Sequence, residues 1–137
     1  MTDGSLRLRK GQNDMMPAKE MAMEIVKAMD SKKGLDIRLL HTADITVLAE
    51  YFAICTASSA THVKTLTEEI DHVMSELGEP PLRREGHRSG SWVLLDFGCV
   101  IVHVFSDEAR KFYDLERLWH DAENVDLSEI LQQEPQN

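Results

Sequence analysis

The side chains that could do chemistry in this chain are scattered, and their spacing argues against catalysis. Asp96-Phe97-Gly98 matches the magnesium-binding tripeptide of protein kinases, but three residues recur by chance and no catalytic-loop motif precedes them. Ser58 and Ser59 stand between a predicted strand and a predicted helix, where capping of the helix explains both hydroxyls. The chain has neither a Gly-x-Gly-x-x-Gly motif nor a P-loop, so no phosphate cradle is recognisable.

The histidines and acids show no metal-ligand spacing either. His62 and His72 share a predicted helix, but ten residues of helix separate them by about 80° around its axis. Glu68-Glu69 is typical of a solvated helix face. Cys55 and Cys99 have no cysteine neighbours and are expected to be reduced thiols. The sequence therefore predicts no catalytic residue, no metal and no cofactor.

The segment that says most about function lies between residues 90 and 106, and it predicts a hairpin. β-Branched and aromatic residues run on both sides of Gly98, and glycine tolerates the positive φ of a two-residue hairpin loop. We take Gly98-Cys99 as that loop. The cross-strand pairs that follow are Asp96 with Ile101, Leu94 with His103, and Trp92 with Phe105.

Alternation along the two strands sorts their side chains onto two faces. One face is wholly apolar and predicts core; it consists of Val93, Leu95, Phe97, Val100, Val102 and Val104. The other combines apolar groups with an acid and an imidazole. We call this second set the mixed face; it consists of Trp92, Leu94, Asp96, Ile101, His103 and Phe105.

Two interpretations of the mixed face are open at this point. A buried polar group without a partner costs roughly 1–3 kcal/mol, so a fully internal face rarely holds Asp96 and His103. A fully solvated face rarely holds Trp92 and Phe105. The mixture therefore suits a surface that another chain covers. Alternatively, a helix of this chain covers the face, and the two polar side chains bond to the backbone of that helix.

The length and the net charge of the chain limit the kinds of partner that it can bind. The chain has 137 residues, enough for one domain that buries about two-thirds of its unfolded surface. Its net charge is −9, and residues 107–137 hold nine acids against three bases. Such a surface does not neutralise phosphates, so we expect no direct nucleic-acid binding as the main source of affinity. It would attract a basic protein, although charge that only keeps the chain soluble is the alternative.

Two further features bear on location. No apolar run approaches the length of a membrane span. The first sixteen residues lack the apolar core of a signal peptide. We therefore expect a cytoplasmic protein that does not bind membranes.

Hydrophobic spacing predicts the elements that must position the mixed face. Residues 1–16 are polar and predict a flexible N-terminal segment, and residues 45–48 are ambiguous between helix and strand. After His120 we expect a loosely structured tail with one turn at 127–131. The fold class is α/β (α+β), a mixed β-sheet with helices packed on it. The predicted order is a helix from Pro17 to Lys32, strands at 36–41 and 51–56, a helix capped by Ser58-Ser59, a strand at 82–85, the hairpin, and a long helix capped by Ser106.

Three blocks of the sequence together resemble the ribosomal silencing factor family, also called Iojap. They are Tyr51–Ser59 with His62-Val63, the hairpin Trp92–Gly98 with Val100–Phe105, and Arg110–Glu116 with Leu118-Trp119. The match covers residues 17–120 and predicts that they form the domain, followed by an acidic C-terminal tail at 121–137. The chain departs from the family at Cys99, where Asp usually follows the glycine, and at Leu48-Ala49-Glu50, which replaces more polar residues.

The resemblance implies a nucleotidyltransferase-like fold without its catalytic signature, and this chain indeed has no Asp-x-Asp motif. It also implies that the protein binds the large ribosomal subunit through large-subunit ribosomal protein fourteen, blocks subunit joining and represses translation. A homodimer is a further implied association. The alternatives are a nucleotidyltransferase-like enzyme acting on nucleotides and an adaptor with a non-ribosomal partner.

The expected contact residues follow from the resemblance and from the mixed face. Trp92 is the expected apolar anchor, because aromatic side chains dominate desolvated interface centres. Phe97 points to the core face, and packing in the core would explain it equally well. Helix packing likewise would explain Leu115, Leu118 and Trp119. The full set of expected contacts is Trp92, Leu94, Asp96, Phe97, Gly98, Ile101, His103, Phe105, Tyr113 and Glu116.

Overall fold

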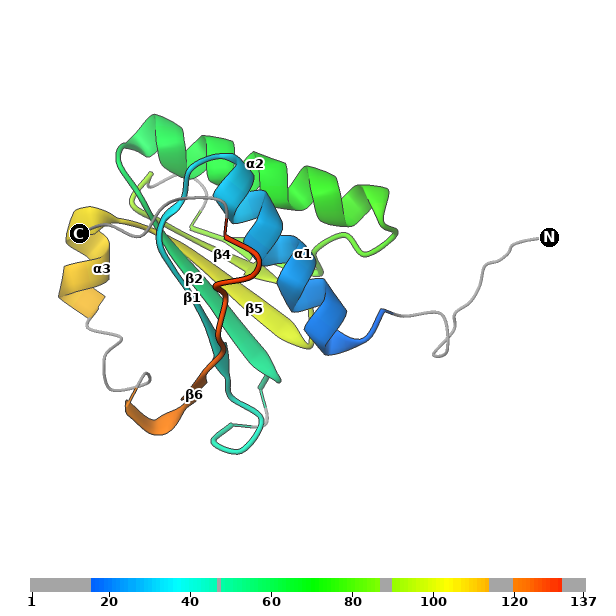
Figure 1. The fold of residues 1–137 in the computed structure, drawn as a ribbon. Coiled ribbons are helices and arrows are strands. Elements are labelled where there is room, and N and C mark those ends of the chain that lie inside the picture. Colours follow the sequence, from blue (N-terminus) through cyan, green and yellow to red (C-terminus); the bar gives the residue numbers. More distant parts are fainter. Residues whose placement is uncertain (1–15, 47, 87–89, 114–119, 132–137) are drawn as a thin grey trace.

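A six-stranded mixed sheet forms the middle of the molecule, with the strand order β3-β4-β5-β2-β1-β6 (Figure 1). This computed structural model describes residues 16–46, 48–86, 90–113 and 120–131. β2 and β5 are parallel, and the other neighbouring strands are antiparallel. The strands are β1 (Leu35–His41), β2 (Tyr51–Ala57), β3 (Arg83–Glu85), β4 (Trp92–Asp96), β5 (Val100–Ser106) and β6 (Glu123–Asn124).

Two long helices, α1 (Ala18–Ser31) and α2 (Ala60–Glu76), cover one face of the sheet (Figure 1). The apolar positions that predicted these helices are buried: Met21, Ala22, Ile25, Val26 and Met29 of α1, and Val63, Leu66, Ile70 and Met74 of α2. The hydroxyl of Ser59 accepts a 3.0 Å hydrogen bond from the backbone N–H of His62, which confirms the predicted cap. The predicted order of the first eight elements is therefore confirmed.

The short helix α3 (Asp107–Tyr113) lies on the opposite face of the sheet. Its Ala109 packs in a small cluster with Leu40, Ile54 and Phe105. The hydroxyl of Ser106 accepts a 3.1 Å hydrogen bond from the N–H of Ala109, as the predicted cap requires. Residues 114–119, over which the sequence predicted a longer helix, lie outside the described residues.

The segment after His120 is more ordered than the sequence suggested. β6 pairs with Leu40 and His41 at the edge of the sheet, and Leu127 is buried in the main core. A turn closes at Leu127–Leu131, as predicted. The expectation of a loosely structured tail is therefore wrong for residues 123–131, because a two-residue strand carries too little periodicity to be predicted.

The loop between β1 and β2 resolves the ambiguity at residues 45–48. Ile45 and Thr46 both donate backbone hydrogen bonds to the carbonyl of Thr42, so the described part of this stretch is a turn. Among the described residues, none of the helices has the length and apolar character needed to cross a bilayer.

Candidate functional site

The β4–β5 hairpin has the register that the sequence predicted. Trp92 lies opposite Phe105, Leu94 opposite His103, and Asp96 opposite Ile101. The backbone N–H of Phe97 donates to the carbonyl of Val100 at 2.9 Å, which closes the hairpin around Gly98 and Cys99. Gly98 has a φ of +88°, a backbone conformation that residues with a Cβ rarely adopt, so this position favours glycine. The six predicted core residues of this hairpin are all at most 3% exposed.

Three rings of the mixed face form a nearly parallel stack. The planes of His103 and Phe105 differ by 4°, with centroids 5.7 Å apart. Trp92 lies across both, with centroids 6.0 Å from His103 and 5.5 Å from Phe105. Phe52 of β2 contacts His103 from the other side in a tilted arrangement. Such contacts fix the orientation of the Trp92 ring, which is itself partly exposed.

His103 is neutral in this environment. Its side chain is 8% exposed, and burial lowers the pKa of His103 to about 4 from an ordinary value of 6.5. The indole Nε1–H of Trp92 donates to Nδ1 of His103 at 3.2 Å, so the proton of the imidazole lies on Nε2. The indole N–H of Trp92 and Nδ1 of His103 thus satisfy each other within the stack.

Asp96 is held at the tip end of the mixed face. Its carboxylate accepts a 2.8 Å hydrogen bond from the N–H of Gly98 and forms a 3.2 Å ion pair with Arg83 of β3. Arg83 also pairs with Glu85 at 2.8 Å. These contacts replace the helix-backbone bonds that one interpretation proposed for Asp96. The mixed face is therefore polar at its tip end and aromatic toward α3.

The residues of the mixed face differ in how far the rest of the chain buries them. Phe105 is 1% exposed because Ala109 of α3 packs with it, whereas Trp92, Leu94, Asp96 and Ile101 keep part of their surface accessible. The interpretation in which a helix covers the face thus holds only for its end at Phe105. An apolar surface with one carboxylate remains accessible over β4 and the start of β5, and this arrangement suits docking of another protein.

Some of the expected contact residues do not reach this surface. Phe97 is 3% exposed and lies in the core beneath α1 and α2, because its strand position places it on the other face. Phe105 and His103 are also buried, so they support the surface without offering area to a partner. Tyr113 is the last residue of α3 and its side chain is not described, while Glu116 lies outside the described residues.

Two residues of this surface were missed by the sequence analysis. Phe52 is the parallel partner of Ile101 on β2, and its partly buried ring enlarges the apolar area. The parallel pairing of β2 and β5 would have revealed it, but the sequence alone does not give strand order. Arg83 was overlooked because only the antiparallel register of β3 and β4 places it opposite Asp96.

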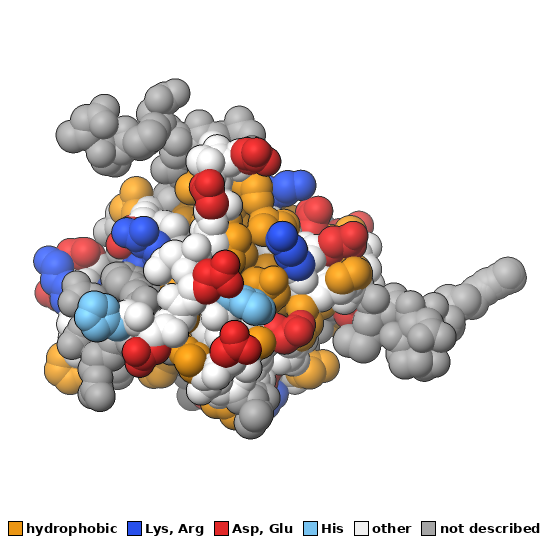
Figure 2. Space-filling view, turned by 60° about the horizontal axis from the view of Figure 1, so that its bottom comes forward, with side chains coloured by type: hydrophobic (Ala, Val, Ile, Leu, Met, Phe, Trp, Pro, Cys, Tyr) orange, Lys and Arg blue, Asp and Glu red, His pale blue; other side chains and the backbone are white. Residues whose placement is uncertain are grey.

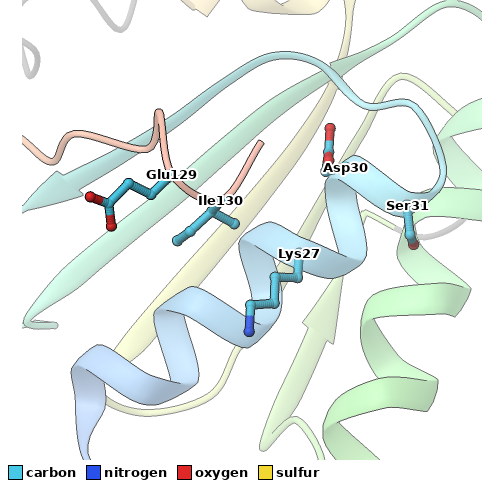
Figure 3. Close-up of a pocket in the computed structure, with 5 residues that line it drawn as sticks. All are labelled: Lys27, Asp30, Ser31, Glu129 and Ile130. Carbon is cyan, nitrogen blue, oxygen red and sulfur yellow. The ribbon is translucent and has the colours of Figure 1, made fainter. Parts of the chain in front are cut away.

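The described residues hold no candidate metal site, and the groups around a hollow beside α1 do not form a ligand site. No group of three His, Cys, Asp or Glu side chains within them could hold a metal ion. A hollow of about 460 Å³ lies between α1 and the C-terminal segment (Figure 3). Lys27 there is 3.7 Å from Glu24, the hydroxyl of Ser31 donates to a backbone carbonyl, and Glu129 extends away from both. These groups do not converge on a common point.

The geometry thus defines an α/β protein whose candidate functional feature is the accessible, largely apolar part of the mixed face. The family model "Ribosomal silencing factor during starvation" matches residues 15–137. Ribosomal silencing factor RsfS of Halalkalibacterium halodurans is 36% identical over 85% of this chain and 99% of its own length. That of Bacillus subtilis is 40% identical over 73% and 85%.

A crystal structure of a protein from Chromobacterium violaceum matches this fold with a TM-score of 0.74. The two chains are 36% identical, and the match covers 77% of this chain and 88% of the other. The chain therefore belongs to the ribosomal silencing factor family, whose members also include proteins named Iojap. It is a family of non-catalytic, ribosome-binding regulators of translation.

Proposed function

We propose that the accessible part of the mixed face binds large-subunit ribosomal protein fourteen and thereby blocks the joining of the ribosomal subunits. The observation that carries this proposal is the partly exposed Trp92, held rigid by His103 and Phe105 beside Leu94 and Ile101. A preorganised, partly exposed aromatic ring on an apolar surface is a typical interface anchor. Family membership supports the ribosome as the target.

Electrostatics and size are consistent with this role. The net charge of −9 favours approach to a basic protein, and Asp96 supplies a carboxylate at the edge of the apolar surface. A standard interface of about 800 Å² per partner would exclude another large body from the same site. Repression of translation then requires no reaction, only occupancy of the surface where the small subunit docks.

Three finer expectations belong to the same proposal. We propose that the fold is nucleotidyltransferase-like but carries no nucleotide chemistry, which calorimetry with magnesium and nucleotides tests through the absence of binding heat. We also propose a cytoplasmic location, tested by co-sedimentation with cytosolic ribosomes. A homodimer is proposed to use the same mixed face, so light scattering should show dissociation of the dimer when the large subunit is bound.

The direct test measures light scattering of purified ribosomal subunits at a magnesium concentration that permits joining. The wild-type chain is expected to suppress the joining signal stoichiometrically and without nucleotide. Trp92→Ala is expected to weaken binding to the large subunit by about tenfold or more, because the central anchor is lost. Equal affinity of Trp92→Ala and wild type would remove Trp92 from the site.

A matched pair of leucine variants controls for effects on the fold. Leu94→Ala changes the mixed face, whereas Leu77→Ala changes an exposed leucine that caps α2 in the layer of helices. Only Leu94→Ala is expected to weaken binding, while both variants should keep the circular dichroism of the wild type. Normal subunit joining in the presence of saturating wild-type chain would overturn the proposed function altogether.

A further inference from the structure

Exposed apolar side chains flank the hairpin tip, in the β1–β2 loop and just before β3. Leu82 is 72% exposed, Leu48 is 70% exposed and Ile45 is 42% exposed. Leu82 flanks the tip on the side of β3, where its N–H donates to the carbonyl of Asp96 at 2.7 Å. We call these three residues, together with Gly98 and Cys99, the tip surface.

A hollow of about 290 Å³ opens between the tip and the β1–β2 loop. Its lining includes Leu48, Ala49, Glu50, Gly98 and Cys99. The backbone N–H groups of Glu50 and Tyr51 both donate to the carbonyl of Cys99, at 2.9 and 3.1 Å, so the two walls are fixed to each other. About ten waters fill such a volume, which is room for one large apolar side chain. The two departures from the family noted in the sequence meet in this hollow.

The surroundings of the hollow are acidic. Glu50 lines it, and Asp44 is exposed in the same loop. Burial raises the pKa of the Cys99 thiol, and the nearby carboxylates of Glu50 and Glu79 raise it further. No Lys or Arg is among the described residues that line the hollow. Figure 2 turns the bottom of the molecule forward and shows acidic, basic and hydrophobic side chains interspersed on that face.

The tip surface is continuous with the mixed face. Asp96 and Ile101 form the last cross-strand pair of the mixed face, and the tip loop follows directly. A standard interface of about 800 Å² involves some 20–30 residues on each side, which the few accessible side chains of the mixed face cannot provide. Extension toward α3 would meet charged side chains, such as the 3.2 Å pair of Lys111 and Asp107. The tip offers exposed apolar side chains, bordered by Glu50 on the side of the β1–β2 loop and by the Arg83–Asp96 pair on the side of β3.

We propose that the tip surface is a second part of the same docking interface, and that its hollow receives an apolar side chain from a basic segment of the ribosomal partner. This inference rests on the proposed function. It assigns the mixed face the aromatic anchor and the tip surface a pocket that faces positively charged residues of the partner. The tip surface thus adds exposed residues to those of the mixed face within one interface.

Cys99 lines this hollow and is partly exposed, although its Sγ also lies 3.5 Å from Sδ of Met21 on the side of α1. It therefore provides a probe of the hollow within the chain itself. The other cysteine, Cys55, is fully buried, and burial raises its pKa to about 12, so alkylation reports on Cys99. The experiment treats the chain with N-ethylmaleimide, alone and with saturating large ribosomal subunit, and follows the Cys99 peptide by mass spectrometry. Alkylation is expected to slow by about tenfold or more in the complex, since a partner that fills the hollow excludes the reagent.

Charge-introducing variants give an independent readout. Leu48→Lys and Leu82→Lys are expected to keep the fold, because both side chains are exposed, and to weaken subunit binding by about tenfold each, because apolar area is lost and a positive charge faces the basic partner. Leu77→Lys, at the end of α2, serves as the matched control and should bind like wild type.

The outcomes separate the two proposals. If the wild-type chain does not bind the large subunit, the proposed function fails. If it binds and Trp92→Ala weakens binding, but Cys99 alkylates at an unchanged rate and the tip variants bind normally, only the tip surface is overturned. Protection of Cys99 that appears at high protein concentration without ribosomes would instead assign the hollow to a second copy of the chain and overturn the ribosomal occupant.

Discussion

At the scale of single residues, His103 contributes both to the stability of the molecule and to the shape of the mixed face, which is the proposed docking surface. It lies under Trp92, receives the indole N–H, and is kept neutral by burial. Alternation along the strand predicted its place on the mixed face. Its burial could not be predicted, because it depends on Phe52 of β2, and local patterns do not show that β2 pairs with β5. Phe97 is the opposite case, because alternation predicted that its side chain lies in the core, and it is buried there.

The depressed pKa of His103 predicts a loss of stability in mild acid. Between pH 6.5 and pH 4 the unfolded chain binds a proton at this residue and the folded chain does not, so acidification favours unfolding. We expect the free energy of unfolding to fall by about 2 kcal/mol from pH 7 to pH 5 through this residue alone. Urea titrations at the two pH values measure it.

The control for this prediction is His103→Asn, whose amide oxygen can accept the hydrogen bond from Trp92 but does not titrate. Groups other than His103 titrate in both proteins, so the informative quantity is the difference between their pH dependences. An identical decline in wild type and variant would show that His103 does not carry the effect.

At the scale of elements, α3 is tied to the sheet by one arginine. Nη1 of Arg110 donates to the hydroxyl of Thr56 at 2.6 Å and to the carbonyl of Asp36 at 2.9 Å, and Nη2 lies 3.3 Å from the Asp36 carboxylate. Asp36 has a φ of +48° and stands where the pairing of β1 with β2 is irregular. Arg110 thus joins α3 to two strands, and α3 in turn covers Phe105.

Arg110→Met is expected to cost about 2–3 kcal/mol of stability, because bonds from a buried charged donor are lost and the Thr56 hydroxyl stays buried. Urea unfolding measures this loss, and hydrogen exchange should accelerate at residues 107–113. Lys111→Met is the matched control on the same helix. Its ion pair with Asp107 is exposed, so a change below about 0.5 kcal/mol is expected. Similar losses for both variants would contradict the anchoring role.

Elements differed in how well the sequence predicted them. The predicted register of the hairpin is correct at every residue pair, since Gly98 and a strict two-residue alternation leave only one register. The predictions of the two long helices are correct because their apolar residues repeat at helical spacing, as Met21, Ile25 and Met29 do in α1. β6 could not be predicted, because Glu123 and Asn124 are polar and extended only through pairing with β1. The proposed docking surface could not be predicted in full, because Phe52 and Arg83 reach it only through the order of the strands in the sheet. Local sequence patterns do not contain that order.

At the scale of the whole molecule, the C-terminal segment completes the core. Val125 donates a 2.9 Å backbone hydrogen bond to Leu39, and Leu127 is 7% exposed among core residues, while Ile130 packs against them (Figure 3 shows Ile130 near α1). Residues 123–131 are thus part of the folded unit as well as carriers of negative charge.

Leu127→Ala is therefore expected to destabilise the fold by roughly 2–3 kcal/mol, from lost burial and the cavity left behind. Thermal unfolding measures the effect. Leu77→Ala, which removes the same atoms from a 44% exposed site, should change stability by less than about 0.5 kcal/mol. A negligible effect of Leu127→Ala would mean that the C-terminal segment does not contribute to the core.

The parallel pairing of β2 with β5 also constrains the order in which the chain folds. β1 with β2 and β4 with β5 are close in sequence, whereas Tyr51 meets Val100 only across α2, β3 and β4. Closing such a long loop is slow, so we expect two locally formed halves to join along these strands in the last step. The docking surface takes Phe52 from one half and Ile101 from the other. A nascent chain should therefore be unable to bind its target until β5 has emerged, which keeps it from acting on the ribosome that is still making it.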